Sequence, residues 1–403
     1  MEYCSCRRPV EAIIYLHQNN PQLRALILSN SSFSGDPRVL RQVQWLVEEN
    51  WCVDGIGIGF KPTELNGEYF KLRQPNLAIR MLIYVFCNSR RRSKALIEHQ
   101  IDFKFSEYFS KHSYDLLIAN DTDFLPFVEK ALVSTLIHDK AHLHLDLHEF
   151  FEGQGHGFVW KLLFRRYQSW LNTFIPSDIW NTRSTVSRDI AVEYESALKI
   201  SKVAIVLNTP RFSDLSPTEL QHEQIHLVYL GKGDSARSLD LLIASMEMLD
   251  GRFYLNFMLT GSKRYQTILR KKAIKSSASD RIYFHKSVQH NLVANSINKF
   301  DLSLIFFPPK TKNLLYSLPN KFFESVQGRL GVVIGESPSM VSLVNQFGNG
   351  IIVNGWGPDS LANSLNSLTA SKISELKQNS NSAASVLSAE NEKMAFLSAL
   401  GRV

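Results

Sequence analysis

The sequence predicts an α/β protein made of two Rossmann-like domains, on three observations. Its 403 residues are about twice the length of a typical single domain. Short apolar runs, each followed by a polar loop and an amphipathic stretch, recur in both halves of the chain, which is typical of strand-loop-helix units. A polar stretch over residues 213–224 separates the halves as a linker. We therefore expect an N-terminal domain over residues 1–212, a C-terminal domain over 225–370, and terminal helices over 371–403 that can cross back to the first domain.

Composition and charge narrow the class of protein. Hydrophobic residues make up 44% of the chain and charged residues 21%, which is enough apolar surface to bury a core. The chain shows no run of 18 apolar residues and no signal-peptide order at its start, so we expect a cytoplasmic protein. The net charge of +7 indicates an anionic partner such as a sugar nucleotide or anionic lipid head groups. No zinc-finger, RRM or helix-turn-helix pattern supports nucleic acid as that partner. The cysteines at 4, 6, 52 and 87 lack the spacing of a metal site and are expected to be free thiols.

The first strand-loop-helix unit is predicted at the start of the N-terminal half. Residues 23–29 form an apolar run, and small residues follow over 30–35. Asp36 and Pro37 then open a helix, because a short acidic side chain caps a helix and proline fits its first turn. Arg38 comes next, either solvated or facing a ligand. The G-x-G-x-x-G fingerprint is absent, so we do not expect this turn to bind a dinucleotide.

Polar side chains end the later strands of this half. Residues 114–121 predict a strand that ends in Asn120 and Asp121, at the edge where open parallel sheets bind ligands. The strand predicted over residues 141–149 alternates, so that three histidines and Asp146 share one face. Side chains on one strand face point in parallel and do not converge on one ion, so we do not expect a tetrahedral metal site there.

Three segments of this half leave alternatives open. Residues 82–86 are apolar and fit a strand or a helix. The basic run over residues 90–94 is either a solvated face or a patch for a membrane surface or an acceptor phosphate. Residues 158–171 predict a long helix with aromatic and basic residues intermixed. That helix could pack on the sheet with its arginines outward, or lie on a membrane surface.

The C-terminal half begins with a predicted strand over residues 225–231 and a basic, glycine-containing loop over 232–238. Such a loop exposes backbone N–H groups to phosphate, and Arg237 adds a forked, permanently charged donor. An ordinary strand-to-helix loop is the alternative. Further strands over residues 253–259, 281–285 and 301–306 continue the repeat.

The most informative stretch covers residues 317–336. Pro319 precedes an amphipathic run, and Gly328 and Gly331 end that run before the apolar residues 332–334. This order predicts a loop, a helix, a glycine turn and a buried strand.

Lys321 and Glu324 lie three residues apart on the predicted helix, so they share a face near its N-terminus. Unpaired N–H groups and the helix dipole favour an anion at that end. The pair would suit a nucleoside diphosphate, with the lysine on phosphate oxygens and the carboxylate on ribose hydroxyls. A weak surface ion pair is the alternative.

This stretch resembles the nucleotide-sugar-binding segment of family-4 glycosyltransferases. These are retaining enzymes of the GT-B fold, in which two Rossmann-like domains face each other across a cleft. Residues 318–324 are LPNKFFE and residues 331–334 are GVVI, similar to the family's "lPnK-hydrophobic-FE" and "G-hydrophobic-PVI" segments. In the first half, residues 36–39 are DPRV and residues 146–150 are DLHEF, similar to the family's "D-P-R-V" and "D-x-H-E" segments.

The resemblance implies a role for each matching residue. The catalytic candidates act on the diphosphate and on the sugar, and they are His148, Arg237 and Lys321. The donor-binding candidates are Gly231, Gly233, Arg237, Ser287, Val288, Tyr316, Asn320, Lys321 and Glu324. The acceptor-side candidates are Asp36, Arg38, Asn120 and Asp121. Two positions depart from the family, because Tyr316 stands where many members have a donor-contacting glutamate and Ser238 stands where they have glycine.

The function implied is transfer of a sugar from a nucleoside-diphosphate donor, above all a UDP-sugar, to a glycan or lipid-linked acceptor. Retention of configuration and catalysis without a metal or other cofactor are expected with it. Because acceptors of such enzymes are often membrane-embedded, attachment to the inner face of a membrane through the basic segments is a further expectation. Tyr316 keeps open the alternative of a non-catalytic partner protein, and a sugar-nucleotide epimerase of the same fold is a second alternative.

Overall fold

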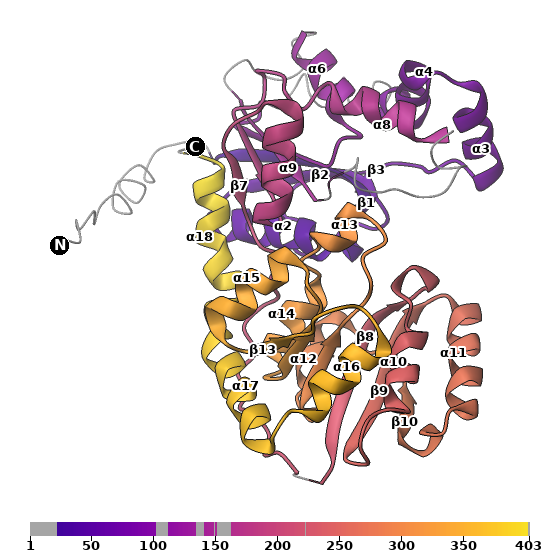
Figure 1. The fold of residues 1–403 in the computed structure, drawn as a ribbon. Helices are drawn as coiled ribbons and strands as arrows, with labels where there is room; N and C mark the ends of the chain where they lie inside the picture. Colours follow the sequence, from indigo (N-terminus) through magenta and orange to yellow (C-terminus); the bar gives the residue numbers. More distant parts are fainter. Residues whose placement is uncertain are drawn as a thin grey trace, which may run out of the picture.

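Two parallel β-sheets flanked by helices form the structure, one in each half of the chain (Figure 1). The computed structural model describes residues 22–101, 112–133, 141–148, 150, 163–221 and 223–401. Within these residues the first sheet has seven strands in the order β3-β2-β1-β4-β5-β6-β7, and the second has six in the order β10-β9-β8-β11-β12-β13. The predicted α/β class with two Rossmann-like domains is confirmed.

The first sheet is buried on both faces. Its strands are β1 (Arg24–Ser32), β2 (Cys52–Ile58), β3 (Tyr69–Lys71), β4 (Leu116–Asn120), β5 (His142–Leu147), β6 (Thr182–Thr185) and β7 (Val203–Ile205). Alternate residues of β1 pack into different apolar clusters, Leu26 and Leu28 on one face and Ala25 and Ile27 on the other. Burial on both faces explains why these strands are near-continuous apolar runs in the sequence.

Helices cover this sheet and extend beyond its β3 edge (Figure 1). They are α2 (Pro37–Glu48), α3 (Leu77–Phe86), α4 (Ser89–Ser93), α6 (Leu125–Val133), α8 (Arg165–Asn172) and α9 (Arg188–Leu198). As predicted, Asp36 caps α2 and Pro37 occupies its first turn, with the Asp36 carboxylate accepting a hydrogen bond of 3.0 Å from the Arg38 N–H.

The second sheet repeats the pattern. Its strands are β8 (Ile225–Gly233), β9 (Phe253–Gly261), β10 (Ile282–His285), β11 (Leu302–Ile305), β12 (Gly331–Ile334) and β13 (Gly350–Ile352). Its helices are α10 (Asp240–Met246), α11 (Lys263–Lys275), α12 (Val293–Ile297), α13 (Lys312–Leu315), α14 (Asn320–Gln327), α15 (Pro338–Phe347), α16 (Pro358–Asn366) and α17 (Ala370–Ala383).

Both sheets have a switch point where ligands are expected. From β1 the chain moves outward to β2 and β3, and it returns to the other side of β1 with β4. In the second sheet β8 and β11 are related in the same way. Open parallel sheets bind ligands at the carboxyl ends of the strands at such points. The loops after β1, β4, β8 and β11 are therefore the places to look for a site.

The helix and strand predicted within residues 317–336 are confirmed as α14 and β12. As expected, α14 ends at Gly328, which caps its C-terminus with a negative φ, and the left-handed residue of the turn is the next one, Arg329, with φ 63°. Gly328 is also required for packing. A Cβ at this position would lie 2.6 Å from Cγ1 of Ile297.

The last helix, α18 (Ala389–Ala399), returns to the first domain (Figure 1). The Phe396 ring lies 5.1 Å from the Trp45 ring on α2. The Glu392 carboxylate accepts a hydrogen bond of 2.8 Å from the Leu207 N–H, at the start of the segment that joins the two sheets.

The structure decides one of the segments that the sequence left open and describes parts of the other two. Residues 82–86 belong to helix α3 and not to a strand. Of the helix predicted over residues 158–171, the structure describes α8, and residues 158–162 lie outside the described part. In the basic run, Arg90, Arg91 and Lys94 are exposed. Arg92 is buried and donates to the carbonyl groups of Tyr84, Cys87 and Leu163, so it is not a surface charge. No helix within the described residues is long and apolar enough to cross a membrane.

Candidate functional site

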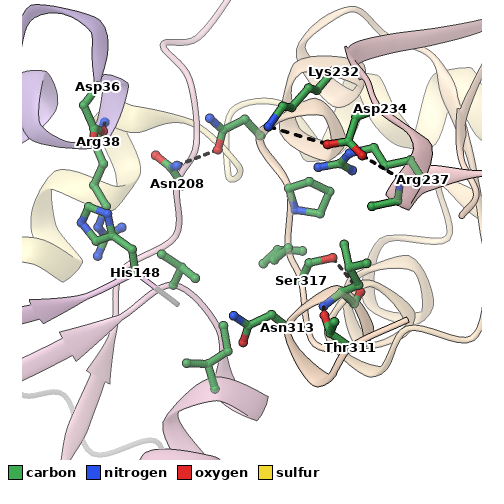
Figure 2. Close-up of a pocket in the computed structure, with 17 residues that line it drawn as sticks. Asp36, Arg38, His148, Asn208, Lys232, Asp234, Arg237, Thr311, Asn313 and Ser317 are labelled. Atoms are coloured by element: carbon green, nitrogen blue, oxygen red, sulfur yellow. Dashed lines mark hydrogen bonds and ion pairs between the residues drawn. The ribbon is translucent and has the colours of Figure 1, made fainter. Parts of the chain in front are cut away.

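A hollow of about 500 Å³ lies between the two domains, at the carboxyl ends of both sheets (Figure 2). Its first-domain wall consists of Asp36, Arg38, His148, Val186, Ile190 and Asn208. Its second-domain wall consists of Lys232, Asp234, Ala236, Arg237, Thr311, Asn313, Leu314, Ser317, Leu318, Pro319 and Asn320. Most of these residues belong to segments that follow β1, β5, β8 and β11, so the two switch points together build the hollow.

Two cations, Arg237 and Lys321, meet on one aromatic ring beside this hollow. The Arg237 guanidinium lies 5.0 Å from the centre of the Phe307 ring, and Lys321 Nζ lies 4.8 Å from the same centre. Lys321 Nζ also lies 4.0 Å from the centre of the Tyr229 ring. Arg237 Nη1 and Lys321 Nζ are buried and have no hydrogen-bond partner among the described residues. Buried donors normally have a hydrogen-bond partner, so these two donors are available to bind an anion.

The protonation of Lys321 reflects the same environment. Burial and the neighbouring Arg237 charge lower the pKa of Lys321 well below its usual range, and the Glu324 carboxylate only partly opposes them. A bound anion next to Nζ would favour the charged form again. The site therefore strengthens its own positive charge when an anion arrives.

The carboxyl end of β8 carries a cation that the sequence analysis missed. Lys232 lines the hollow, with its Nζ 3.7 Å from the Asp234 carboxylate. Its place directly after the strand residues 225–231 is the signal that could have identified it. Ser238, where the resemblance expects glycine, has φ 49° and so adopts the left-handed conformation that glycine favours. The candidates Gly231, Gly233, Ser287 and Val288 are not among the residues that line the hollow.

Glu324 has a different partner from the one its spacing predicts. One carboxylate oxygen lies 2.9 Å from His290 Nδ1, and Glu324 lines a second hollow of about 410 Å³. This second hollow lies between α2, residues 210–213 and residues 290–294. Lys321 and Glu324 share one helix but do not present their charges to a single cavity.

A buried carboxylate, Asp146, organises the first-domain wall. Arg38 donates to both Asp146 oxygens, from Nε and Nη2, each at 2.6 Å. Gln42 Nε2 and Ser184 Oγ donate to the same carboxylate at 2.7 and 2.6 Å. Burial by itself would raise the pKa of Asp146, but the Arg38 guanidinium lowers it well below its usual range.

The interpretation of Arg38 as a solvated residue is therefore wrong. Arg38 is 4% exposed, and its remaining donor Nη1 binds the Val206 carbonyl at 2.7 Å. Although Arg38 lines the hollow, its hydrogen bonds go to the protein. It positions Asp146, and Asp146 in turn faces His148.

His148 follows β5 directly and points its ring at carboxylates. Its Nε2 lies 3.1 Å from Asn120 Oδ1 and 3.4 Å from Asp146, and its Nδ1 lies 3.6 Å from Asp121. Burial lowers the pKa of His148, but the Asp121 and Asp146 carboxylates outweigh it and raise the pKa to about 9. His148 is therefore a cation at neutral pH, on the wall opposite Arg237 (Figure 2).

Asn120 and Asp121 hold His148 and are not themselves among the residues that line the hollow. Asn120 is buried, and its amide group donates to Gln42 Oε1 at 2.9 Å. Asp121 accepts a hydrogen bond of 3.1 Å from the His148 backbone N–H, in a left-handed conformation with φ 61°. The other histidines of this strand face have different environments. His144 binds the hydroxyls of Thr182 and Ser184, and the described residues include no cluster of three His, Cys, Asp or Glu side chains that could hold a metal.

Two asparagines complete the polar lining, and the sequence analysis did not select them. Asn208 donates to Asn320 Oδ1 at 2.6 Å, while its own Oδ1 is buried and has no partner among the described residues. Both amide atoms of Asn313 are likewise buried and unpaired within the described part of the chain. Amide groups of this kind can donate to and accept from sugar hydroxyls. Their positions in loops after strand ends are the only signal that the sequence offers for them.

Tyr316 lies outside the lining of the hollow. Its ring packs against the first-domain core, and its carbonyl accepts a hydrogen bond of 3.1 Å from Ser339 Oγ. Burial and the nearby Glu193 carboxylate raise the pKa of its phenol group. In this structure Tyr316 contributes to contact between the two domains.

Several solved structures have the same overall fold as this protein. A sucrose-phosphate synthase from Thermosynechococcus elongatus aligns with a TM-score of 0.68 and 13% identity, over 93% of this chain and 97% of that chain. WaaG, a glycosyltransferase involved in lipopolysaccharide biosynthesis, aligns with a TM-score of 0.65 and 11% identity, over 94% and 100%. A trehalose-6-phosphate protein from E. coli bound with UDP-2-fluoro glucose aligns with a TM-score of 0.65 and 13% identity, over 94% and 99%.

These similarities establish the fold, since each alignment covers both halves of the chain. The predicted GT-B fold is confirmed. No protein-family model matches the sequence, and no curated protein matches it closely enough in sequence to count as a relative.

Proposed function

We propose that this protein is a glycosyltransferase that moves a sugar from a nucleoside-diphosphate donor to a glycan or lipid-linked acceptor. The observation that carries the proposal is the pair of basic side chains Arg237 and Lys321, whose Nη1 and Nζ atoms are buried beside the interdomain hollow and have no hydrogen-bond partner among the described residues. A diphosphate offers them several oxygens and neutralises both charges. The similarity to a structure bound with UDP-2-fluoro glucose supports a UDP-sugar as the donor.

The chemistry requires stabilisation of a departing diphosphate while the sugar carries positive charge. Cations held in place before reaction act where negative charge develops, and they need no reorganisation at that moment. Arg237 and Lys321 would take this role, with the N–H groups at the start of α14 beside Asn320. Because these groups can neutralise the leaving group themselves, we propose transfer without a metal ion, and we propose retention of configuration with it.

The sugar and the acceptor would then lie towards the first domain. Protonated His148 can donate a hydrogen bond to a sugar hydroxyl, and Asn208 and Asn313 offer further amide groups to the same space. The second hollow, which Glu324 lines, would take the ribose and base. For Glu324 to accept hydrogen bonds from ribose hydroxyls, the donor must displace His290 from the carboxylate.

The test uses a panel of sugar nucleotides with the purified full-length protein. Donor affinity is measured by calorimetry, and turnover by release of the free nucleoside diphosphate. Lys321→Met and Arg237→Gln should each lower turnover by about 100-fold, as for loss of one preorganised donor. Neither should unfold the protein, because each substitution keeps the aliphatic part of the side chain and removes donors that have no hydrogen-bond partner among the described residues. Lys272→Gln is the matched control, since Lys272 lies on α11 in an exposed pair with Asp240, 2.8 Å away.

The outcomes separate the alternatives. Wild-type turnover of Lys321→Met at saturating donor would refute the diphosphate assignment. Tight donor binding without release of diphosphate would favour the non-catalytic partner protein that Tyr316 leaves open. An altered sugar on an intact nucleotide would identify an epimerase.

We further propose that the protein works in the cytoplasm and meets its acceptor at the inner face of a membrane. The cations available for that contact are the exposed Arg90, Arg91 and Lys94 near α4, with Arg165 and Arg166 on α8. Lys161, in the basic helix predicted over residues 158–171, lies outside the described residues.

A further inference from the structure

The second hollow, the one that Glu324 lines, has walls from both domains. Helix α2 forms the first-domain wall, and residues 290–294 with Glu324 form the second-domain wall. Apolar side chains supply much of the lining, among them Leu40, Phe212 and Val293. Sites for small molecules are typically apolar, with a few polar groups that fix the orientation of the ligand. The polar groups of this hollow therefore decide which ligand it can bind.

Arg41 lines this hollow with an unpaired buried donor. Its side chain is 7% exposed, and its Nη2 atom is buried without a hydrogen-bond partner among the described residues. Other polar side chains of the lining have partners. Arg211 Nη2 donates to Gln44 Oε1 at 3.3 Å, and His290 Nδ1 lies 2.9 Å from the Glu324 carboxylate. Because a buried donor normally has a partner, Nη2 of Arg41 is available to a ligand.

The charges around Arg41 connect it with Glu324. Burial, and after it the neighbouring Arg38 charge, lowers the pKa of Arg41 to about 9, while the Asp36 and Glu324 carboxylates act in the opposite direction. Arg41 on α2 and Glu324 on α14 thus line one hollow from different domains, within electrostatic reach of each other. A ligand held by Glu324 would extend towards Arg41.

The order of groups in a nucleoside diphosphate determines which part reaches Arg41. In the function proposed above, the phosphates meet Arg237 and Lys321, and the ribose meets Glu324. The base follows the ribose and therefore extends towards the α2 wall. In a pyrimidine, C4 lies opposite the ring nitrogen that carries the ribose. The substituent on C4 is then the group that faces Arg41.

We propose that Arg41 recognises the carbonyl oxygen on C4 of uracil and so selects uridine nucleotides over cytidine nucleotides. A guanidinium has donors and no acceptor. The uracil oxygen can accept a hydrogen bond from Nη2, whereas the cytosine amino group would place a donor against a donor. A neutral oxygen also suits this hollow better than a further anion, because the Glu324 carboxylate lines it too. The inference rests on the proposed function for the positions of the phosphates and the ribose.

The experiment measures the affinity of the full-length protein for UDP and for CDP by calorimetry. The two nucleotides have the same phosphates and ribose and differ in the C4 edge of the base. The wild-type protein should bind UDP about 10- to 100-fold more tightly than CDP, as for one specific contact to a base edge. Arg41→Met keeps the aliphatic part of the side chain and removes its donors. This variant should lose most of the UDP preference, with little change in its affinity for CDP.

Arg264→Met is the matched control. Arg264 is exposed on α11 and lines neither hollow, so this variant should keep the wild-type affinity for both nucleotides. Inorganic pyrophosphate separates the base contact from the phosphate contact. Arg41→Met should bind pyrophosphate like the wild type. Lys321→Met should bind pyrophosphate, UDP and CDP more weakly and should keep the preference for UDP.

Three results would overturn the inference. The first is equal affinity of the wild-type protein for UDP and CDP. The second is a loss in Arg41→Met that is the same for both nucleotides, which would mean that only the charge matters. The third is an equal loss for pyrophosphate, which would make Arg41 a phosphate contact.

The base contact and the proposed function can fail separately. If Lys321→Met bound pyrophosphate normally while Arg41→Met lost the UDP preference, the diphosphate assignment would be wrong and the base contact would remain supported. If the wild-type protein bound neither nucleotide, both proposals would be wrong. Because the measurement is of binding and not of turnover, it applies equally to a non-catalytic partner protein.

Discussion

Replacing Asp146 with asparagine tests the buried network that supports His148. The substitution keeps the shape of the side chain and removes its charge. Arg38, which is 4% exposed, would then keep a buried guanidinium without its counter-ion. His148 would lose one of the two carboxylates that raise its pKa to about 9.

The expected magnitude follows from the burial of the pair. Removing one partner of a buried, hydrogen-bonded ion pair costs about 3–5 kcal/mol, because the other charge remains in the interior. In a domain of this size each kcal/mol corresponds to a few degrees, so the melting temperature should fall by roughly 10 °C. The pKa of His148 should also fall towards its ordinary value of about 6.5.

Thermal and urea unfolding measure the first effect, and the pH titration of the His148 ring by NMR measures the second. Glu375→Gln provides the matched control, since it removes one partner of the exposed Lys372–Glu375 pair, 2.7 Å apart. Such a pair contributes no more than about 0.5 kcal/mol. If Asp146→Asn lost as little stability as Glu375→Gln, the network would not have the structural role assigned to it.

Three further predictions concern the pH dependence, the ribose contact and one packing position. The folded protein keeps a proton on His148 up to about pH 9, whereas the unfolded chain releases it near pH 6.5, so the free energy of unfolding should fall as pH rises between about 6.5 and 9. Asp121→Asn should make this fall smaller in urea titrations at several pH values. An unchanged fall would contradict the role of Asp121 in raising the pKa of His148. Glu324→Gln should weaken nucleotide binding, and a donor lacking the ribose hydroxyls should show no further loss with this variant, since the two changes remove the same hydrogen bonds; additive losses by calorimetry would place the carboxylate elsewhere. Gly328→Ala should cost about 1–3 kcal/mol in unfolding experiments, because its Cβ would lie 2.6 Å from Ile297, whereas Gly251→Ala, with no atom within 4 Å of the added carbon, should change stability by no more than about 0.5 kcal/mol.

The candidate site could be predicted where one short segment carries both the geometry and the chemistry. The start of α14 at Asn320 and the capping of α2 by Asp36 follow from local signals, and both appear in the structure. The partners of these segments could not be predicted in the same way. Arg38 and Asp146 are 108 residues apart in the chain, and the spacing within either segment does not indicate that they meet.

Helix α14 shows the same division on a smaller scale. The three-residue spacing correctly places Lys321 and Glu324 on one helix near its start. What each side chain meets depends on other elements. Lys321 contacts the rings of Tyr229 on β8 and Phe307 after β11, and Glu324 contacts His290.

By itself the sequence determined the repeat of strand-loop-helix units, the two-domain α/β class and the segment expected to meet a diphosphate. These depend on periodicity, capping and turn chemistry, which act between residues close together in the chain. Only the tertiary structure decided that Arg237 and Lys321 share one ring, that Arg38 is buried against Asp146, and that α3 turns its apolar face outward. Burial, ion pairing and exposure depend on which distant elements pack together, and a local pattern is compatible with more than one such packing.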